Sequence, residues 1–301
     1  MTQTNNDITL YNRRSGQFET EQVYGRKWMD IFYGTTWGRA ITGWLLCRHP
    51  LSRLYGRLQQ HPRSRAKIDA FVTLYGIDLS EVEIPPGGFA SFNDFFIRRL
   101  KPQARPIDTD PSAMVSPADS RLSVFPIEPD TRLTVKGASM SVSQLLGGTH
   151  LDDGFMGGTC LVYRLAPCDY HRFGHVDEGV QGPVHIIDGP LHSVSPLALR
   201  HKPDVHCTNY RHWCEVQSPH WGTILQIEVG AMMVGSVVQL QPDGGPCRRG
   251  QEKGYFQFGG STVIVLLESN RVRMDDDIME HSQQGIETLV RYGERVGTFT
   301  E

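Results

Sequence analysis

A short stretch near the C-terminus places a hydroxyl side chain directly after two glycines. The stretch Gly259-Gly260-Ser261-Thr262 interrupts an apolar, β-branched run that is otherwise typical of a buried strand. Because Gly260 carries no Cβ, its carbonyl carbon is open to attack by the hydroxyl of Ser261. Such an attack moves the acyl group from nitrogen to oxygen and forms an ester within the chain.

That ester is a route to a cofactor made from the chain itself. Elimination across Cα and Cβ of Ser261 leaves dehydroalanine, which hydrolyses to a pyruvoyl group. The chain is then cut in two, and the shorter piece begins with a ketone that forms Schiff bases and accepts electrons. The alternative is structural, since glycines followed by hydroxyl residues are also typical of a tight turn or bulge. On this stretch alone the turn is the more common case.

Two further stretches hold residue types that serve in acid–base catalysis. Asp169 and His171 are two positions apart, so they share a face if the stretch is a strand. A carboxylate beside an imidazole holds its tautomer and raises its basicity. Asp119 follows a turn that Pro117 restricts. Each of these motifs alone is more often structural than catalytic.

The composition is that of an ordinary soluble chain. Its 301 residues, 39% hydrophobic and 21% charged, suffice for one large domain or two small ones. The net charge of -3 gives no reason to expect nucleic acid as a partner. No stretch approaches the roughly 18 apolar residues of a spanning helix. The polar opening from Met1 to Tyr24 lacks the apolar core of a secretory signal.

The cysteines do not form a recognisable framework. All six are scattered without a CxxC pair, which favours thiols in a reducing compartment. His206, Cys207, His212 and Cys214 are close in sequence, but their spacing matches no familiar zinc pattern. We interpret them as a polar loop and expect no metal.

The stretch from Trp28 to Leu58 has large apolar residues at helical spacing, and Pro50 is expected to divide it into two helices. No acidic residue occurs between Asp30 and Asp69. Amphipathic helices with arginine on one face and tryptophan on the other suit the surface of an anionic bilayer. A helical hairpin packed on the protein's own core is the alternative, and both remain open. The basic residues are Arg39, Arg48, Arg53, Arg57, Arg63, Arg65 and Lys67.

The residue pattern changes from helical to strand-like near residue 110. Before it, Ser91 is a plausible N-cap for a helix over 92–100, with Asp94 in the first turn. From Met114 onward, short apolar runs alternate with Gly, Pro and Asp, which is typical of a mainly β domain. We therefore expect an α+β fold with a helical, membrane-associating region over residues 1–110 and a mainly β catalytic domain over 111–301.

Taken together, these stretches resemble the phosphatidylserine decarboxylases, a pyruvoyl-dependent family that converts phosphatidylserine to phosphatidylethanolamine. The resemblance covers nearly the whole chain, and Gly-Gly-Ser-Thr combined with Asp-Tyr-His-Arg is highly specific. The motifs that carry it, in family order, are Asn12-Arg13 through Val23-Tyr24-Gly25, Phe92 to Asp108, Ser116-Pro117-Ala118-Asp119, Lys136-Gly137, Asp169-Tyr170-His171-Arg172-Phe173, Gly230-Ala231 with Val234-Gly235, and Gly259-Gly260-Ser261-Thr262.

The resemblance implies a division of roles among the candidate residues. Cleavage would fall between Gly260 and Ser261, giving a long β chain and a short α chain that begins with the covalent pyruvoyl cofactor. Asp119 and the Asp169/His171 pair would assist self-cleavage in a relay like that of serine proteases. In turnover the substrate amine would form a Schiff base with the ketone, and His171 would reprotonate the carbanion.

The resemblance also sets expectations for partners and location. They are phosphatidylserine in an anionic membrane, the chain's own α and β pieces, a homodimer, and peripheral attachment to the cytoplasmic face of a bacterial inner membrane. Two other functions remain open. One is a pyruvoyl decarboxylase of a soluble amino acid such as tryptophan. The other is a non-catalytic lipid-binding module, although the presence of Ser261, Asp119 and His171 speaks against it.

Two positions depart from the family pattern. Many members carry a second histidine three residues after the first, but position 174 here is Gly and His175 stands one place later. Either His171 serves both steps, or His175 fills the second role after a local shift. Ser120 stands where many relatives have glycine, which leaves Asp119 in place.

Overall fold

The computed structural model describes residues 8–21, 31–42, 47, 49–128, 130, 132–135, 138–149, 153–232, 236–257 and 261–299. Some residues that carry sequence-based expectations lie outside these ranges. They are Trp28, Trp44, Leu45, Arg48, Lys136, Gly137, Val234, Gly235, Gly259 and Gly260.

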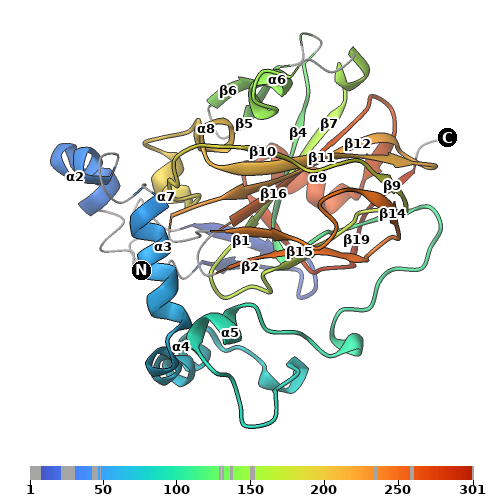
Figure 1. The fold of residues 1–301 in the computed structure, drawn as a ribbon. Helices are drawn as coiled ribbons and strands as arrows, with labels where there is room; N and C mark the ends of the chain where they lie inside the picture. The colour runs from blue at the N-terminus through green and yellow to red at the C-terminus, as the bar shows by residue number, and fades with distance from the viewer. Residues whose placement is uncertain are drawn as a thin grey trace.

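The fold is α+β, which confirms the sequence prediction, and a large mixed sheet organises it (Figure 1). Within the described ranges this sheet has eleven strands, in the order β14-β9-β11-β12-β16-β7-β4-β18-β1-β2, with β10 paired to β11. They are β1 (Thr9–Asn12), β2 (Gln17–Thr20), β4 (Ser120–Pro126), β7 (Thr159–Leu165), β9 (Gly179–Gln181), β10 (His185–Ile187), β11 (Arg211–Ser218), β12 (Gly222–Gly230), β14 (Gly245–Cys247), β16 (Ser261–Leu267) and β18 (Glu287–Val290).

Three smaller sheets lie against the large one. The first has the order β13-β15-β8, the second β17-β19-β3, and the third pairs β5 with β6. Their strands are β3 (Ala113–Val115), β5 (Arg132–Val135), β6 (Ala138–Ser141), β8 (Arg172–Gly174), β13 (Val237–Gln239), β15 (Glu252–Phe256), β17 (Val272–Met274) and β19 (Arg295–Phe299).

Side chains alternate along β16 between two hydrophobic cores, as expected for a strand buried on both faces. Val263 and Val265 point into a core shared with the β8, β13 and β15 sheet, the β3, β17 and β19 sheet, and α9 (Asp276–Gln283). Ile264 and Leu266 point into a core shared with β5, β6 and α6 (Val142–Leu145). We call these sides of the large sheet the Val263 face and the Ile264 face.

The helices α3 (His49–Gln60) and α4 (Ile68–Tyr75) lie at one side of the large sheet, and α5 (Phe92–Phe96) lies below α3 (Figure 1). Pro50 lies in the first turn of α3, which confirms that a helix begins there. Ser91 caps α5 by accepting a bond from the Asp94 main-chain nitrogen (3.1 Å), as predicted, although the helix ends earlier than expected, at Phe96. The remaining helices are α2 (Thr36–Ile41), α7 (Pro196–Leu199) and α8 (Val205–Thr208), with 3-10 turns at Pro62–Lys67, Leu79–Glu81, Pro102–Ala104 and Asp153–Phe155.

The helical region has a core of its own, but it begins later than the sequence indicates. An aromatic cluster of Phe71, Phe89, Phe92, Phe95 and Phe96 holds α4 and α5 together. Residues 9–20, in contrast, form a hairpin whose first strand, β1, pairs in parallel with β18. The start of the predicted helical region therefore belongs to the large sheet. This pairing is non-local, so the local pattern of the hairpin does not indicate it.

Candidate active site

Ser261 is the first residue of β16, and its hydroxyl is buried. The residue has 0% exposure, and its Oγ has no hydrogen-bond partner among the described residues. A serine that served only to stabilise a turn would bond its hydroxyl to nearby backbone. The Ser261 hydroxyl makes no such bond to a described residue, and Gly259 and Gly260 lie outside the described ranges.

The sheet brings several chain segments to the edge where Ser261 lies. The register pairs Ser261 with Gly230, the last residue of β12, and with Leu165, the last residue of β7. The stretch 166–171 follows β7 directly, and β4 begins at Ser120 on the other side of β7. Segments far apart in sequence therefore meet beside the expected cleavage point.

His171 reaches this edge from the small sheet that covers the Val263 face. The main-chain nitrogen of Phe256 donates to the carbonyl oxygen of His171 (2.9 Å), which extends the pairing of β8 and β15 by one residue. Strand alternation then directs His171 to the same side as Phe173, which is buried in the core of the Val263 face. Ser261 points to that same face, since it lies two residues before Val263.

The imidazole of His171 is held in one orientation. Its Nδ1 lies 3.0 Å from the carbonyl oxygen of Asp169, and the ring centroid lies 4.0 Å from that of Phe96. A carbonyl oxygen only accepts hydrogen bonds, so Nδ1 must carry the proton. The neutral ring then has its lone pair on Nε2, which is the state required of a general base.

The Asp169 side chain does not orient the imidazole as expected. Residues 167–169 form a turn rather than a strand, so the shared strand face does not apply. The Asp169 carboxylate pairs with Arg121 and accepts a bond from the main-chain nitrogen of Ala166 (2.7 Å). The orienting group is instead the main-chain carbonyl of Asp169. The carboxylate acts indirectly, by fixing the turn that presents this carbonyl.

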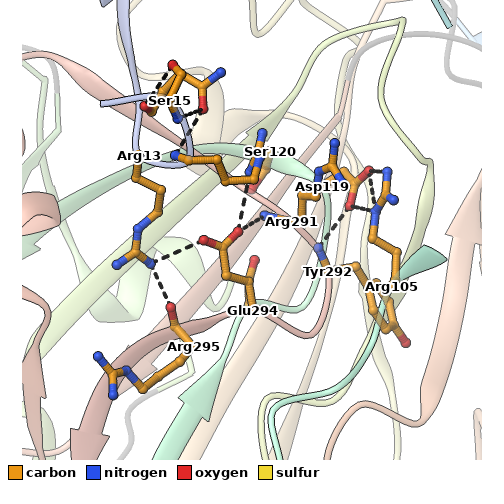
Figure 2. A network of polar contacts seen from close by, with 12 residues as sticks. Arg13, Ser15, Arg105, Asp119, Ser120, Arg291, Tyr292, Glu294 and Arg295 are labelled. Carbon is orange, nitrogen blue, oxygen red and sulfur yellow. Dashed lines mark hydrogen bonds and ion pairs between the residues drawn. The ribbon is translucent and has the colours of Figure 1, made fainter. Parts of the chain in front are cut away.

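Asp119 is an ion-paired carboxylate near the same edge. Figure 2 shows Arg105 donating to it through Nε (2.8 Å) and Nη2 (2.6 Å), while the main-chain nitrogen of Tyr292 donates to Oδ1 (2.8 Å). Within the described ranges, its oxygens bond to neither His171 nor Ser261. A relay of direct contacts is therefore not assembled here, and a role for Asp119 in self-cleavage stays a prediction.

His175 is buried, as His171 is, and it lies near a buried ion pair. Lys253 is buried with it and donates to Glu228 Oε1 (2.8 Å). Burial, with the charge of Lys253, lowers the pKa of His175 to about 3, so the ring is neutral at physiological pH. A side chain at position 174 has no room, because a Cβ on Gly174 would lie 2.2 Å from the Tyr292 hydroxyl.

A chain of buried charges behind the site was not found from the sequence. Arg121 contacts both Asp169 and Glu21, and Arg164 contacts Glu21 (2.8 Å) and Glu287 (2.5 Å). The available signal is that Arg121 and Arg164 interrupt apolar strands. Charged residues there must find partners, since unpaired burial costs several kcal/mol. Which partners they find depends on strand pairing.

A buried hydroxyl, an oriented imidazole and fixed carboxylates that meet at one end of a sheet are typical of an enzyme active site. The fold and this arrangement define the chain as an enzyme. The sequence model of the family "Phosphatidylserine decarboxylase" matches residues 92–298. The chain belongs to the phosphatidylserine decarboxylase family.

Several relatives match along almost their whole length. The chain is 41% identical to a phosphatidylserine decarboxylase proenzyme of Clostridium botulinum (strain Alaska E43 / Type E3), over 97% of this chain and 99% of that protein. It is 39% identical to the proenzyme of Clostridium perfringens (strain SM101 / Type A), over 96% and 99%. The proenzyme of Desulfitobacterium hafniense (strain Y51) is 40% identical, over 96% and 98%.

Proposed function

We propose that this chain decarboxylates phosphatidylserine to phosphatidylethanolamine, with a pyruvoyl group that it makes from Ser261 by cleaving itself after Gly260. The observation that carries the proposal is the buried Ser261 hydroxyl at the start of β16, which has no hydrogen-bond partner among the described residues and lies beside the segment that holds His171. Relatives about 40% identical over their full length are named as decarboxylase proenzymes, which supports both the substrate and the self-processing.

The proposed self-cleavage starts from the Ser261 hydroxyl. Oγ of Ser261 forms a bond to the carbonyl carbon of Gly260 while the C–N bond breaks, leaving an ester and a new amine. A base then removes the Cα proton of residue 261, the Cβ–Oγ bond breaks, and Gly260 leaves as a carboxylate. Hydrolysis of the dehydroalanine releases ammonia and leaves the pyruvoyl group. Nε2 of His171 is the base whose orientation the structure supports.

In turnover, the pyruvoyl ketone supplies an electron sink for the bond that breaks when carbon dioxide leaves. The side chains of this protein exclude water and supply the proton. The cores on both faces exclude water from the start of β16. We propose that Nε2 of His171 takes up a proton from the substrate ammonium as the amine reacts and then delivers a proton to the substrate carbon, because the carbonyl oxygen of Asp169 holds the ring in place.

The substrate class separates this proposal from a decarboxylase of soluble amino acids. With phosphatidylserine in mixed micelles, we expect the cleaved enzyme to form phosphatidylethanolamine and carbon dioxide. Its kcat/KM should exceed that for free tryptophan or serine by at least about 100-fold, since these lack the phosphodiester and glycerol contacts. Product amines quantified by mass spectrometry decide the question. Equal values for lipid and tryptophan would favour the soluble substrate.

We also propose that the helical region attaches the enzyme to the surface of an anionic membrane. Leu54 and Leu58 of α3 are 54% and 58% exposed, and Arg57 is exposed between them. Residues three and four apart share a helix face, so these side chains form one apolar and basic surface. Trp37 of α2 is 60% exposed, and α2 lies at the same side of the molecule as α3 (Figure 1). None of the helices within the described ranges is long and apolar enough to cross a bilayer.

The double substitution Leu54→Glu/Leu58→Glu is expected to weaken binding to phosphatidylserine vesicles at least tenfold. Each exposed leucine contributes on the order of 1 kcal/mol or more when it leaves water, and each glutamate adds repulsion from the anionic surface. Vesicle sedimentation measures the effect. Val180→Glu/Ile186→Glu, at exposed apolar positions of the large sheet, is the matched control and should bind normally. Equal binding of both variants would contradict the proposed surface.

The remaining assignments rest on the family alone. We propose a homodimer attached peripherally to the cytoplasmic face of a bacterial inner membrane, with the β and α pieces held together after cleavage. The antiparallel pairing of β16 with both β12 and β7 supports the last point, because it binds the C-terminal piece into the centre of the large sheet.

A further inference from the structure

Arg98, just after α5, is a buried guanidinium with spare hydrogen-bond donors. Its exposure is 5%, and Nη2 donates to the carbonyl oxygens of Cys168 (3.1 Å) and Asp169 (3.2 Å). The Nε and Nη1 donors are buried without a hydrogen-bond partner among the described residues. Buried donors on a charged group are expensive to leave unbonded, so such an arrangement points to an acceptor that arrives from outside.

The neighbouring arginines differ from Arg98 because each is neutralised. Arg105 pairs with Asp119 (2.6 Å), and Arg121 pairs with Glu21 (3.0 Å). No carboxylate of the described residues lies within ion-pair distance of Arg98. Burial lowers the pKa of Arg98, although a guanidinium keeps its proton at neutral pH. Asp119 and Asp169 attract this charge only from beyond ion-pair distance, so Arg98 has no direct ionic partner among the described residues.

The positive charge of Arg98 lies close to the imidazole of His171, which we propose to move protons. Nη2 of Arg98 and Nδ1 of His171 both donate to the carbonyl oxygen of Asp169. Two hydrogen bonds to one oxygen keep the nitrogens within roughly 6 Å of each other. The residues next to Arg98 and His171 are also joined, since Nε of Arg172 donates to the carbonyl oxygen of Ile97 (3.0 Å). Arg98 and His171 are thus fixed as a pair.

Arg98 is among the residues that line two surface hollows. One, of about 390 Å³, is lined by Ile84, Phe89 and Ile97 together with Arg98. The other, of about 340 Å³, is lined by Asp119, Asp169 and Tyr170 together with Arg98. The first is partly apolar and the second is polar. A ligand with an anionic centre and apolar groups to one side suits their junction.

We propose that Arg98 binds the phosphodiester of the lipid substrate through Nε–H and Nη1–H, which rests on the proposed decarboxylation. In phosphatidylserine, three bonds separate the reacting Cα from phosphorus, a span of roughly 4 Å for bonds of about 1.5 Å. A phosphodiester on Arg98 therefore leaves Cα within reach of His171. Planar guanidinium donors match two phosphate oxygens.

The substrate carboxylate is the less suitable partner for this cation. Decarboxylation removes the negative charge from the carboxylate as carbon dioxide leaves. A guanidinium bound to that carboxylate stabilises the ground state more than the transition state and slows the reaction. The phosphodiester keeps its charge throughout, so binding it lowers the energy of both states and mainly lowers KM.

The test compares Arg98→Gln with Lys101→Gln, which removes one positive charge from an exposed position that lines neither hollow. Titration calorimetry with short-chain phosphatidylglycerol, a phosphodiester without an amine, should show affinity reduced about 10- to 100-fold in Arg98→Gln, the loss of charge-assisted hydrogen bonds. Lys101→Gln should bind as the native enzyme does. For short-chain phosphatidylserine, KM should rise by a similar factor while kcat per cleaved chain changes less than about threefold. Arg98→Lys should recover part of the affinity.

Binding measurements on the native enzyme test the proposal even if Arg98→Gln fails to fold. The native enzyme should bind short-chain phosphatidylglycerol at least tenfold more tightly than dioctanoylglycerol or inorganic phosphate. Equal affinity for the uncharged lipid, or for free phosphate, overturns the proposal. If Arg98→Gln lowers kcat but leaves the lipid affinity unchanged, the proposal is also overturned. Arg98 then only supports the turn at residues 167–169. Binding needs no turnover, so a native chain that binds the lipid but never decarboxylates would refute the proposed function and leave this site standing.

Discussion

Ser261→Ala is expected to remain one intact chain and to show no decarboxylase activity above background. Without Oγ there is no acyl shift, no cut after Gly260 and no pyruvoyl group. Folding stability should change by less than about 1 kcal/mol, because the buried hydroxyl makes no hydrogen bond with a described residue that alanine would remove. Denaturing gels, activity assays and urea unfolding measure the three outcomes.

The native chain should show two fragments, with the smaller one blocked at its N-terminus in mass spectrometry. Thr288→Val is the matched control, since Thr288 of β18 is another buried hydroxyl without a described partner. That variant should be cleaved and active. A native chain that decarboxylates at full rate while Ser261 remains an ordinary serine would refute the proposal. So would full activity in Ser261→Ala.

Local signals in the sequence predict the elements of this fold well. The Ser91 cap, the break at Pro50 and the apolar run of β16 each depend on residues within one turn or one strand, so they can be recognised without knowing the fold. The N-terminal hairpin could not be placed in this way. Residues 9–20 form strands only beside β18, from the opposite end of the chain.

In the candidate site, too, residue types could be recognised from the sequence, but contacts between distant segments could not. The chemistry of Ser261 and the importance of His171 follow from residue types and order, and the sheet register brings their segments to one edge. The partner of the imidazole was predicted incorrectly, since the Asp169 carboxylate turns to Arg121 of β4. Arg98 is not among the residues that the sequence singles out, because its spare donors become evident only when its burial and partners are known. Pairings between distant segments thus decide which charged side chains are used in ion pairs and which keep unbonded donors.

His171→Asn is expected to lower kcat per cleaved chain by about 10²- to 10⁴-fold and to slow self-cleavage. The asparagine amide nitrogen can replace Nδ1 as the donor to the Asp169 carbonyl, so the turn keeps its bond while Nε2 is lost. The variant therefore removes the proton-transfer atom rather than the support. Gels give the fraction cleaved, and single-turnover assays on that fraction give kcat.

His175→Asn is the comparison that separates the two histidines. His175 has a pKa of about 3, so its imidazolium form, which would be the proton donor, is hardly populated at neutral pH. Its substitution should change kcat less than about threefold, with a stability cost of about 1–2 kcal/mol. In deuterated water, the native enzyme and His175→Asn should place deuterium on one face of the product carbon, because a fixed acid delivers it. Residual turnover by His171→Asn, with solvent as the acid, should lose that preference. If His175→Asn loses the preference and His171→Asn keeps it, the roles are reversed and the buried neutral ring must gain its proton during the reaction.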